Sequence, residues 1–351
     1  MSETVTGTET ISSKPKVFYT PSDLKQFKSV EMFLIENLIP KIGVSVLVGR
    51  PDTGKTQFSR QLAISIANGD TQFCEFELTP TYFRSIYIST EDGLSAIKHA
   101  FSKQQKGFDK EIPDNIFFMP TETMTTVEII KELDHKLSET PVDLIVADSF
   151  GDLFDGRDAN NTAEIRKALK PYHNLAIKHK CAVLFIHHLN KSGYDKSPSQ
   201  VNVMGGAGLT QKARTVLQIT DTDTSERYLT IVKGNYTSKE FKSKSTVLNF
   251  DEDTLLFSNT GKFVESKSIG ENSGGIRSSP SKELLLKNQL NDILSPNPLN
   301  HTDLVQQLMN KLSVSESTAK RRITSALNHE LISSDGSLYS LKNEEPITEN
   351  T

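Results

Sequence analysis

Short runs of apolar residues alternate along the chain with longer segments in which apolar residues recur at helical spacing. The runs are VSVLVG, SIYIST, DLIVAD, AVLFIHH, TVLQIT and YLTIVK, at residues 44–49, 85–90, 143–148, 182–188, 215–220 and 228–233. Runs of this length predict buried strands. Because helical segments separate the first several, we predict an α/β fold: a mostly parallel, twisted sheet with helices on both faces. The last strands are joined by short turns, so we expect that edge of the sheet to be antiparallel.

Three segments between these strands have assignable patterns. Residues 56–69 carry apolar residues at helical spacing, and Gly69 closes them as a C-cap. Residues 167–179 also predict a helix, in which Pro171 implies a kink or a break. The segment VEMFLIENLIPK at 30–41 predicts a short helix followed by a turn.

Changes in composition divide the chain into five parts. Residues 1–28 are polar and predict a flexible tail. Residues 29–262 hold the predicted α/β domain. Residues 263–282 become rich in Ser, Gly, Asn and Pro, which indicates a flexible linker. Residues 283–343 predict a second, compact domain, and the acidic segment 344–351 predicts a disordered tail.

The second domain has the pattern of a winged helix-turn-helix. Helices are predicted over 283–294, 301–312 and 315–331, and two short strands around an Asp335-Gly336 turn follow them. The third helix carries Lys320, Arg321 and Arg322 near its start. In a helix-turn-helix these positions meet the phosphates and bases of duplex DNA. A solvated helix face and a protein-binding module remain the alternatives.

Bulk composition excludes some classes of protein. The chain has 351 residues and a net charge of −4, so the molecule as a whole is not a basic nucleic-acid coat, and DNA contact requires a local patch. Cys74 and Cys181 lack partners at metal-ligand spacing, which favours reduced thiols. The N-terminal segment lacks the apolar core of a signal peptide, and no run of about 18 apolar residues predicts a membrane span. We therefore expect a cytoplasmic protein without membrane contact.

The segment GRPDTGKT at 49–56 fits the phosphate-binding pattern G-x-x-x-x-G-K-[ST]. A predicted strand precedes it and a predicted helix follows it, so backbone N–H groups and the helix N-terminus can surround phosphate oxygens. Lys55 would reach the β- and γ-phosphates of ATP, and the Thr56 hydroxyl would ligate Mg²⁺. The predicted nucleotide contacts are Gly49, Arg50, Pro51, Asp52, Thr53, Gly54, Lys55, Thr56 and Gln57.

Acidic residues end two of the predicted strands. Asp148 follows the apolar run of its strand, where a second acid can hold Mg²⁺ through water; a simple cap is the alternative. Glu91 directly follows SIYIST and is the candidate base or orienting group for the attacking water, with Asp92 as the second choice. A helix N-cap is the alternative for Glu91.

Two adjacent histidines end the strand AVLFIHH. One of His187 and His188 could sense the γ-phosphate and transmit its state to the next loop, whereas a structural pair is the alternative. Neighbouring strand residues point to opposite faces, so only one of the two should face the nucleotide. A zinc site is disfavoured because no further Cys or His lies at ligand spacing.

Six segments between residues 30 and 240 match one family in order. They are LIPKIGVSVLVGRPDTGKT, YISTEDG, LIVADSFGDLF, LFIHHLNKSG, GGAGLTQKARTVLQI and VKGNY. The set resembles the RepA-type hexameric replicative helicases and their RecA- and DnaB-like relatives. The resemblance implies a RecA-like fold, Glu91 as catalytic base, Asp148 as the Walker B acid, and His187 or His188 as the histidine of the family.

The resemblance also implies sites between subunits. Arg214 corresponds to an arginine finger that acts on a neighbouring subunit, with a salt bridge on an edge strand as the alternative, and Lys233 could reach a neighbour's γ-phosphate. A homo-oligomer, a hexameric ring in this family, is therefore expected. Two loops, 151–161 and 190–206, would face the pore, where Lys191 and Lys196 of the second could track single-stranded DNA.

The function expected from sequence is that of a ring-forming, ATP-hydrolysing helicase or replication protein of a plasmid, phage or mobile element. The alternatives are an ATP-switched DNA-binding initiator or regulator, and a recombination mediator without unwinding activity.

Overall fold

A computed structural model of the chain describes most of both predicted domains. The described residues are 18–26, 32–154, 156, 158, 161–194, 196–222, 224–270, 290, 293–294, 297–312, 316–328 and 332–341. The rest of the predicted tails and linker, at 1–17, 27–28, 271–282 and 344–351, lies outside them. None of the described helices has the length and apolarity needed to cross a membrane.

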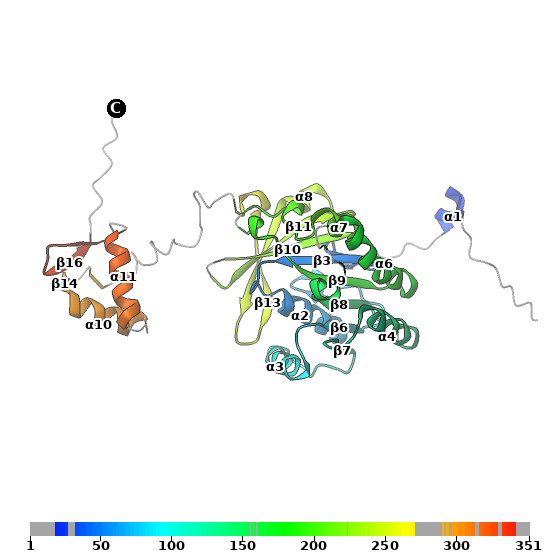
Figure 1. Cartoon of the computed structure of the whole chain (residues 1–351), viewed down its shortest axis with the longest axis horizontal. Helices are drawn as coiled ribbons and strands as arrows, with labels where there is room; N and C mark the ends of the chain where they lie inside the picture. Colours follow the sequence, from blue (N-terminus) through cyan, green and yellow to red (C-terminus); the bar gives the residue numbers. More distant parts are fainter. Residues whose placement is uncertain are drawn as a thin grey trace, which may run out of the picture.

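The large domain is built on one nine-stranded sheet (Figure 1) with the order β13-β12-β11-β10-β3-β9-β8-β6-β7. The strands are β3 (Gly43–Gly49), β6 (Ser85–Ser89), β7 (Ile116–Pro120), β8 (Leu144–Asp148), β9 (Ala182–His188), β10 (Thr215–Asp221), β11 (Glu226–Gly234), β12 (Lys244–Asp251) and β13 (Leu256–Glu265). Strands from β7 to β10 are parallel, and β11 to β13 continue the sheet in antiparallel pairs. The predicted α/β fold and its antiparallel edge are confirmed, in an arrangement consistent with a RecA-like domain.

Helices and short strands complete this domain. The helices are α2 (Lys55–Asn68), α3 (Leu94–Gln105), α4 (Thr126–Glu139), α5 (Phe150–Leu153), α6 (Thr162–His179), α7 (Gly206–Lys212) and α8 (Lys239–Ser243). A further short helix, α1 (Pro21–Gln26), precedes the domain in sequence and has no buried residue. Three 3-10 turns are η1 (Lys191–Gly193), η2 (Gln200–Asn202) and η3 (Ser266–Ser268). Two small hairpins pair β1 (Phe33–Ile35) with β2 (Ile39–Pro40), and β4 (Gln72–Phe73) with β5 (Phe76–Glu77).

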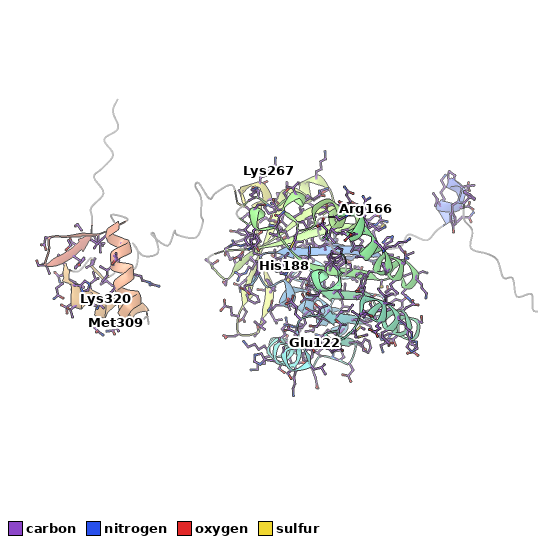
Figure 2. The ribbon with its side chains drawn as sticks, viewed as in Figure 1. Glu122, Arg166, His188, Lys267, Met309 and Lys320 are labelled. Atoms are coloured by element: carbon purple, nitrogen blue, oxygen red, sulfur yellow. The ribbon has the colours of Figure 1, made fainter. Side chains whose placement is uncertain are left out.

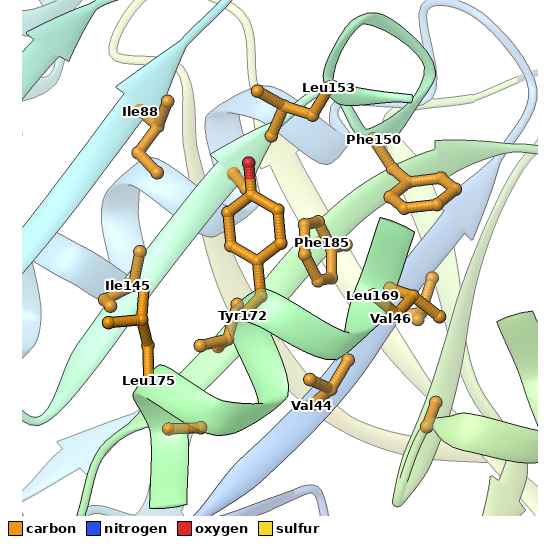
Figure 3. Packing of buried hydrophobic residues seen from close by; sticks show 14 of the residues in the cluster. Val44, Val46, Ile88, Ile145, Phe150, Leu153, Leu169, Tyr172, Leu175 and Phe185 are labelled. Atoms are coloured by element: carbon orange, nitrogen blue, oxygen red, sulfur yellow. The ribbon is translucent and has the colours of Figure 1, made fainter. Parts of the chain in front are cut away.

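Each face of the sheet carries its own apolar core. Helix α2 packs on one face, where Phe58 and Leu62 meet Leu47 and Leu184. Helices α4, α6 and α7 pack on the other. There the rings of Tyr172 and Phe185 meet edge to face at 5.1 Å, as Figure 3 shows. Since both faces are covered, the strand sequences are almost continuously apolar, which is the pattern that made them recognisable.

Two expectations about local structure are wrong, and a third is wrong in part. Within the segment 30–41, the described residues 33–40 form the β1–β2 hairpin instead of a helix, because Asn37 takes a positive φ of 59° and closes a tight turn. The break that was one of the two effects expected at Pro171 is absent, since α6 runs through this residue with Leu169, Tyr172 and Leu175 buried on either side of it. The linker cannot start at residue 263, since β13 runs to Glu265 and η3 to Ser268.

The C-terminal unit has two described helices and a three-stranded antiparallel sheet. Its elements are β14 (Leu299–Asn300), α10 (His301–Leu312), α11 (Glu316–Asn328), β15 (Ile332–Ser334) and β16 (Leu338–Leu341), with sheet order β14-β16-β15. The predicted Asp335-Gly336 turn is present: the Asp335 carboxylate accepts from the N–H groups of Ser337 and Leu338. Of the helix predicted over 283–294, only Leu290, Ile293 and Leu294 are described; they are helical and buried.

Candidate nucleotide-binding site

The loop between β3 and α2 is wrapped around its own lysine. Lys55 begins α2, and its Nζ donates a hydrogen bond of 2.6 Å to the backbone oxygen of Arg50. The Thr53 hydroxyl donates to the same oxygen at 3.0 Å. Asp52 and Gly54 have positive φ values of 62° and 88°, which turn the backbone sharply. The loop thus holds the closed shape that lets backbone N–H groups converge on an anion.

Both glycines of the motif are required by close packing. A Cβ at Gly49 would lie 2.7 Å from the Ile219 oxygen and from the Thr53 hydroxyl. A Cβ at Gly54 would lie 2.6 Å from the ring of Phe257, which approaches from β13. The loop is therefore a tight cradle backed by an aromatic ring that sequence reasoning did not identify.

The Lys55 ammonium is buried with a neutral carbonyl as its acceptor. Burial lowers its pKa, and this effect is opposed by the surrounding carboxylates, Asp148 first and Asp52 next. A buried cation is stabilised by an anionic partner. The site therefore fits a phosphate group close to Lys55, as the motif predicts.

Asp148 and Thr56 present hard oxygen ligands next to the loop. The hydroxyl of Thr56 hydrogen-bonds to the Asp148 carboxylate, and the hydroxyl of Tyr87 donates to it at 2.7 Å. Burial raises the pKa of Asp148, while the hydrogen bonds from Tyr87 and Thr56 and the charge of Lys55 lower it. Hydroxyl and carboxylate oxygens are the ligands that Mg²⁺ prefers, so the residues present fit this ion.

Glu91 follows β6 at the same edge of the sheet. The residue before it, Thr90, donates from its N–H and its hydroxyl to the Asp148 backbone oxygen at 2.8 and 2.9 Å, which ties the end of β6 to the end of β8. The Glu91 side chain is exposed. Its pKa is raised, first by partial desolvation and then by the charges of Asp152 and Asp148, and it is lowered by His188.

Asp152 is a neighbour of Glu91 that sequence reasoning missed. Its Oδ2 accepts from the Ser149 hydroxyl at 2.8 Å, and it shares the single hydroxyl hydrogen of Thr90, 2.7 Å away, with the Asp148 backbone oxygen. Asp152 lies on α5, directly after β8, so it links the end of this strand and the loop 151–161 to the residue that precedes Glu91. The carboxylates of Glu91, Asp148 and Asp152 thus gather at one edge of the sheet.

The two histidines face different surroundings. His187 is buried, with its ring edge to face with Phe150 at 5.3 Å and its Nε2 3.0 Å from the backbone oxygen of Met204. Burial lowers the pKa of His187 to about 4, so this ring is neutral near pH 7. His188 is half-buried and interacts electrostatically with Glu91 (Figure 2 labels its position at the end of β9).

Arg214 and Lys233 lie away from the chain's own phosphate loop. β10 pairs with β3 through Thr215 and Ser45, so Arg214, one residue earlier, lies at the amino-terminal edge of the parallel strands. Its Cγ would be 3.3 Å from a Cβ at Gly43, the first residue of β3. Lys233 donates to the backbone oxygens of Thr210 and Ala213, each at 2.7 Å, and its pKa is lowered by burial and by Arg214.

The remaining predicted residues occupy two other places. Lys191 and Lys196 are exposed in the loop 190–206, and the Arg50 guanidinium of the phosphate loop lies 5.1 Å from the ring of Tyr194 in that loop. Lys320 is exposed and Arg322 half-buried on α11 (Figure 2), whereas the Arg321 side chain lies outside the described atoms. Pro51 is exposed, and the Gln57 backbone oxygen accepts from Gln104 Nε2 at 3.0 Å.

Comparison with known proteins agrees with this geometry. Residues 16–194 match the family model described as AAA domain, over slightly more than half of the chain. The chain is also similar to the DNA repair and recombination protein RadB of Methanobrevibacter smithii, with 24% identity over 205 residues, which is 57% of this chain and 82% of RadB. The phosphate loop, the sheet and the family match together show that the chain belongs to the AAA domain family and carries a RecA-like P-loop ATPase domain.

Proposed function

We propose that this protein is a DNA-associated ATPase that works as a homo-oligomer and couples ATP hydrolysis to two loops that contact single-stranded DNA. The observation that carries the proposal is that candidate site residues and the two loops follow the same two strands. Asp148 ends β8 and His188 ends β9, and the loops 151–161 and 190–206 begin directly after these strands. A change at the γ-phosphate therefore has a short covalent route to both loops.

In the proposed reaction Lys55 binds the β- and γ-phosphates of ATP, and Thr56 with Asp148 would hold Mg²⁺, which would neutralise phosphate charge when bound. Glu91 orients the attacking water and takes its proton. Partial desolvation, and next the charges of Asp152 and Asp148, raise the pKa of this carboxylate, which makes it more basic than an ordinary glutamate. His188, on the Glu91 side, is the better candidate for the γ-phosphate sensor, and His187 contacts the loop 190–206 through Met204.

Hydrolysis would require a second subunit. Arg214 and Lys233 are near each other and lie at the edge of the sheet opposite the chain's own phosphate loop. In a head-to-tail assembly this edge can face the phosphate loop of the next subunit. A ring, a hexamer by resemblance to RepA-type helicases, is the assembly we propose.

Two uses of ATP hydrolysis remain in competition. The RepA-type motifs favour a helicase or replication protein of a plasmid, phage or mobile element. The similarity to RadB favours a recombination mediator comparably well. An ATP-switched initiator or regulator would rely on the C-terminal unit, whose two described helices and hairpin support a winged helix with Lys320, Arg321 and Arg322 toward duplex DNA.

The test is ATP turnover by size-fractionated protein without DNA, with single-stranded DNA and with duplex DNA, using Lys55→Ala as the inactive reference. The proposal expects turnover in the oligomeric fraction that single-stranded DNA stimulates. Turnover that is equal in monomer fractions and indifferent to DNA would refute it. Strand displacement then separates a helicase from the alternatives, and electron microscopy with ATP separates rings from filaments.

A further inference from the structure

Three lysines outside the nucleotide site come together where three segments distant in sequence meet. Lys196 belongs to the loop 190–206, Lys242 to α8, and Lys267 to η3. The Ser197 hydroxyl donates to the Lys267 backbone oxygen at 3.1 Å, and the Ser266 hydroxyl donates to the Lys242 backbone oxygen at 3.2 Å. Figure 2 places Lys267 at the margin of the large domain, near α8.

The chain after β13 is fastened to the loop 190–206 and holds this group in place. Gly270 has a φ of 86°, and a Cβ there would lie 2.3 Å from the Lys196 carbonyl carbon and 2.5 Å from the Ser197 nitrogen. Ile269, next to it, is buried. The backbone of 267–270 therefore packs directly on the loop that carries Lys196, so the three segments that carry the lysines lie next to one another.

The charges of this surface are not neutralised within the described part of the chain. Lys196 and Lys267 are exposed, and the half-buried Lys242 donates to the Gly234 backbone oxygen at 3.3 Å. None of the three makes an ion pair with a described carboxylate, in contrast to Lys262 of β13, which lies 3.6 Å from Glu226. In a protein with a net charge of −4, a group of unpaired cations is a local departure from the average.

We propose that Lys196, Lys242 and Lys267 form a binding surface for the phosphodiester backbone of single-stranded DNA, which extends the contact of the loop 190–206 onto α8 and η3. This proposal rests on the proposed function for the identity of the polyanion. The surface offers point charges on flexible stems, which suits sequence-independent contact with phosphates. It also supplies the cations that the loops 151–161 and 190–206 contain in small number.

The experiment measures binding of fluorescein-labelled oligothymidylate to the full chain by anisotropy over a series of salt concentrations. The test variant is Lys242→Gln with Lys267→Gln, which removes two charges and keeps hydrogen-bonding groups. The matched control is Lys98→Gln with Lys131→Gln, two exposed lysines on α3 and α4. The test variant should bind on the order of tenfold more weakly at low salt, and its salt slope should fall by about 1.4, roughly 0.7 per lost phosphate contact.

Each other outcome has a definite meaning. Equal affinity and equal salt slope in the test and control variants would contradict the proposed DNA-binding surface. Absence of oligonucleotide binding by the wild-type chain at low salt would contradict it as well. ATP turnover without DNA tests the proposed function independently of DNA binding. The test variant should match wild type in that assay. A chain that binds DNA through these lysines but does not hydrolyse ATP would support the binding surface and contradict the proposed function.

Discussion

At the scale of single residues, the pKa of Glu91 is set by partial desolvation and by charged groups from other elements. Asp152 comes from α5, Asp148 from β8, His188 from β9 and Lys55 from α2. Partial desolvation and the two aspartates raise the pKa of Glu91, and His188 opposes them. A carboxylate that must accept a proton from water is a better base when its pKa is raised.

Replacing Glu91 with Gln should lower the turnover number for ATP at least about 100-fold, because a general base contributes that much or more. Nucleotide affinity measured by calorimetry should stay near the wild-type value, since Glu91 binds no ground-state phosphate in the proposed site. In wild type, turnover should fall as the pH drops through the Glu91 pKa, and this fall should begin above the pH expected for an ordinary glutamate. Turnover within tenfold of wild type in the variant would show that another group is the general base, and Asp92 would be the first candidate.

Sequence reasoning could select Glu91 and Asp148 as candidates because each lies at the end of a recognisable apolar run, and Lys55 because it belongs to the phosphate-loop pattern between a predicted strand and a predicted helix. Asp152 and Tyr87 carried no such signal. Tyr87 lies inside an apolar strand, and its hydroxyl reaches Asp148 only because β6 pairs with β8. Contacts set by strand order are long-range in sequence, and no local pattern encodes them.

At the scale of elements, the β12–β13 hairpin is fastened to the helix that follows the phosphate loop. Gln61 of α2 donates from Nε2 to the Phe257 backbone oxygen at 2.9 Å and accepts from the Phe257 N–H at 2.7 Å. Both bonds are buried. The same Phe257 places its ring against Gly54. The antiparallel edge of the sheet thus supports the phosphate loop.

Gln61→Leu should lower the free energy of unfolding by about 1–3 kcal/mol, because it leaves the buried Phe257 N–H without a partner and its carbonyl with only the weak Cys74 thiol donor at 3.5 Å. Urea titration followed by circular dichroism measures the change. Gln105→Leu is the matched control: Gln105 also bridges a carbonyl and an N–H, those of Lys110 and Ile112, at a more exposed position where water can replace it. Equal losses in the two variants would show that burial of the Gln61 bridge is not what stabilises the hairpin.

A second prediction at the scale of elements follows from the packing of residues 267–270 on the loop 190–206. Gly270→Ala should displace the segment, because the new Cβ collides with backbone atoms, and amide hydrogen exchange in residues 190–206 should become faster. Gly261→Ala is the control, since Gly261 has a similar positive φ of 71° but no atom within 4 Å of the new Cβ. Both variants carry about 1–2 kcal/mol of left-handed strain, so faster exchange in both would assign the effect to strain alone.

Helices and strands could be predicted where their burial produces one recognisable pattern of apolar residues in the sequence. The central strands are apolar on both faces and were recognised. β12 and β13 were not, because β13 is the edge strand, β12 is its neighbour, and both mix polar and apolar residues. The β1–β2 hairpin has buried residues at 34, 35, 38 and 39, a spacing that also fits a helix, so only the backbone at Asn37 distinguishes the two.

At the scale of the whole molecule, the parallel sheet separates two sets of charged residues. Lys55 and Glu91 lie at the carboxyl ends of the strands, and Arg214 lies at the amino-terminal edge. The length of β3 between them is rigid and buried. One chain therefore cannot bring Arg214 to its own ATP by a local movement, and the proposed reaction needs the neighbour's copy.

Mixing two inactive variants tests this arrangement directly. Lys55→Ala and Arg214→Ala should each lose turnover as pure proteins, while Arg214→Ala should still bind ATP. In an equimolar mixture with subunit exchange, a site is intact when an Arg214→Ala subunit holds the nucleotide and a Lys55→Ala subunit stands next to it. About a quarter of the sites meet this condition in a head-to-tail assembly, so turnover should recover to roughly that fraction.

The control mixture combines Lys55→Ala with Glu91→Gln. Both residues act in the site of their own subunit, so every site in this mixture lacks one of them and turnover should stay at the level of the pure variants. Recovery only in the mixture with Arg214→Ala is the result that a shared site requires. If neither mixture recovers although size measurements show mixed oligomers, Arg214 acts within its own chain or not in hydrolysis, and the separation of the two edges would have no catalytic meaning.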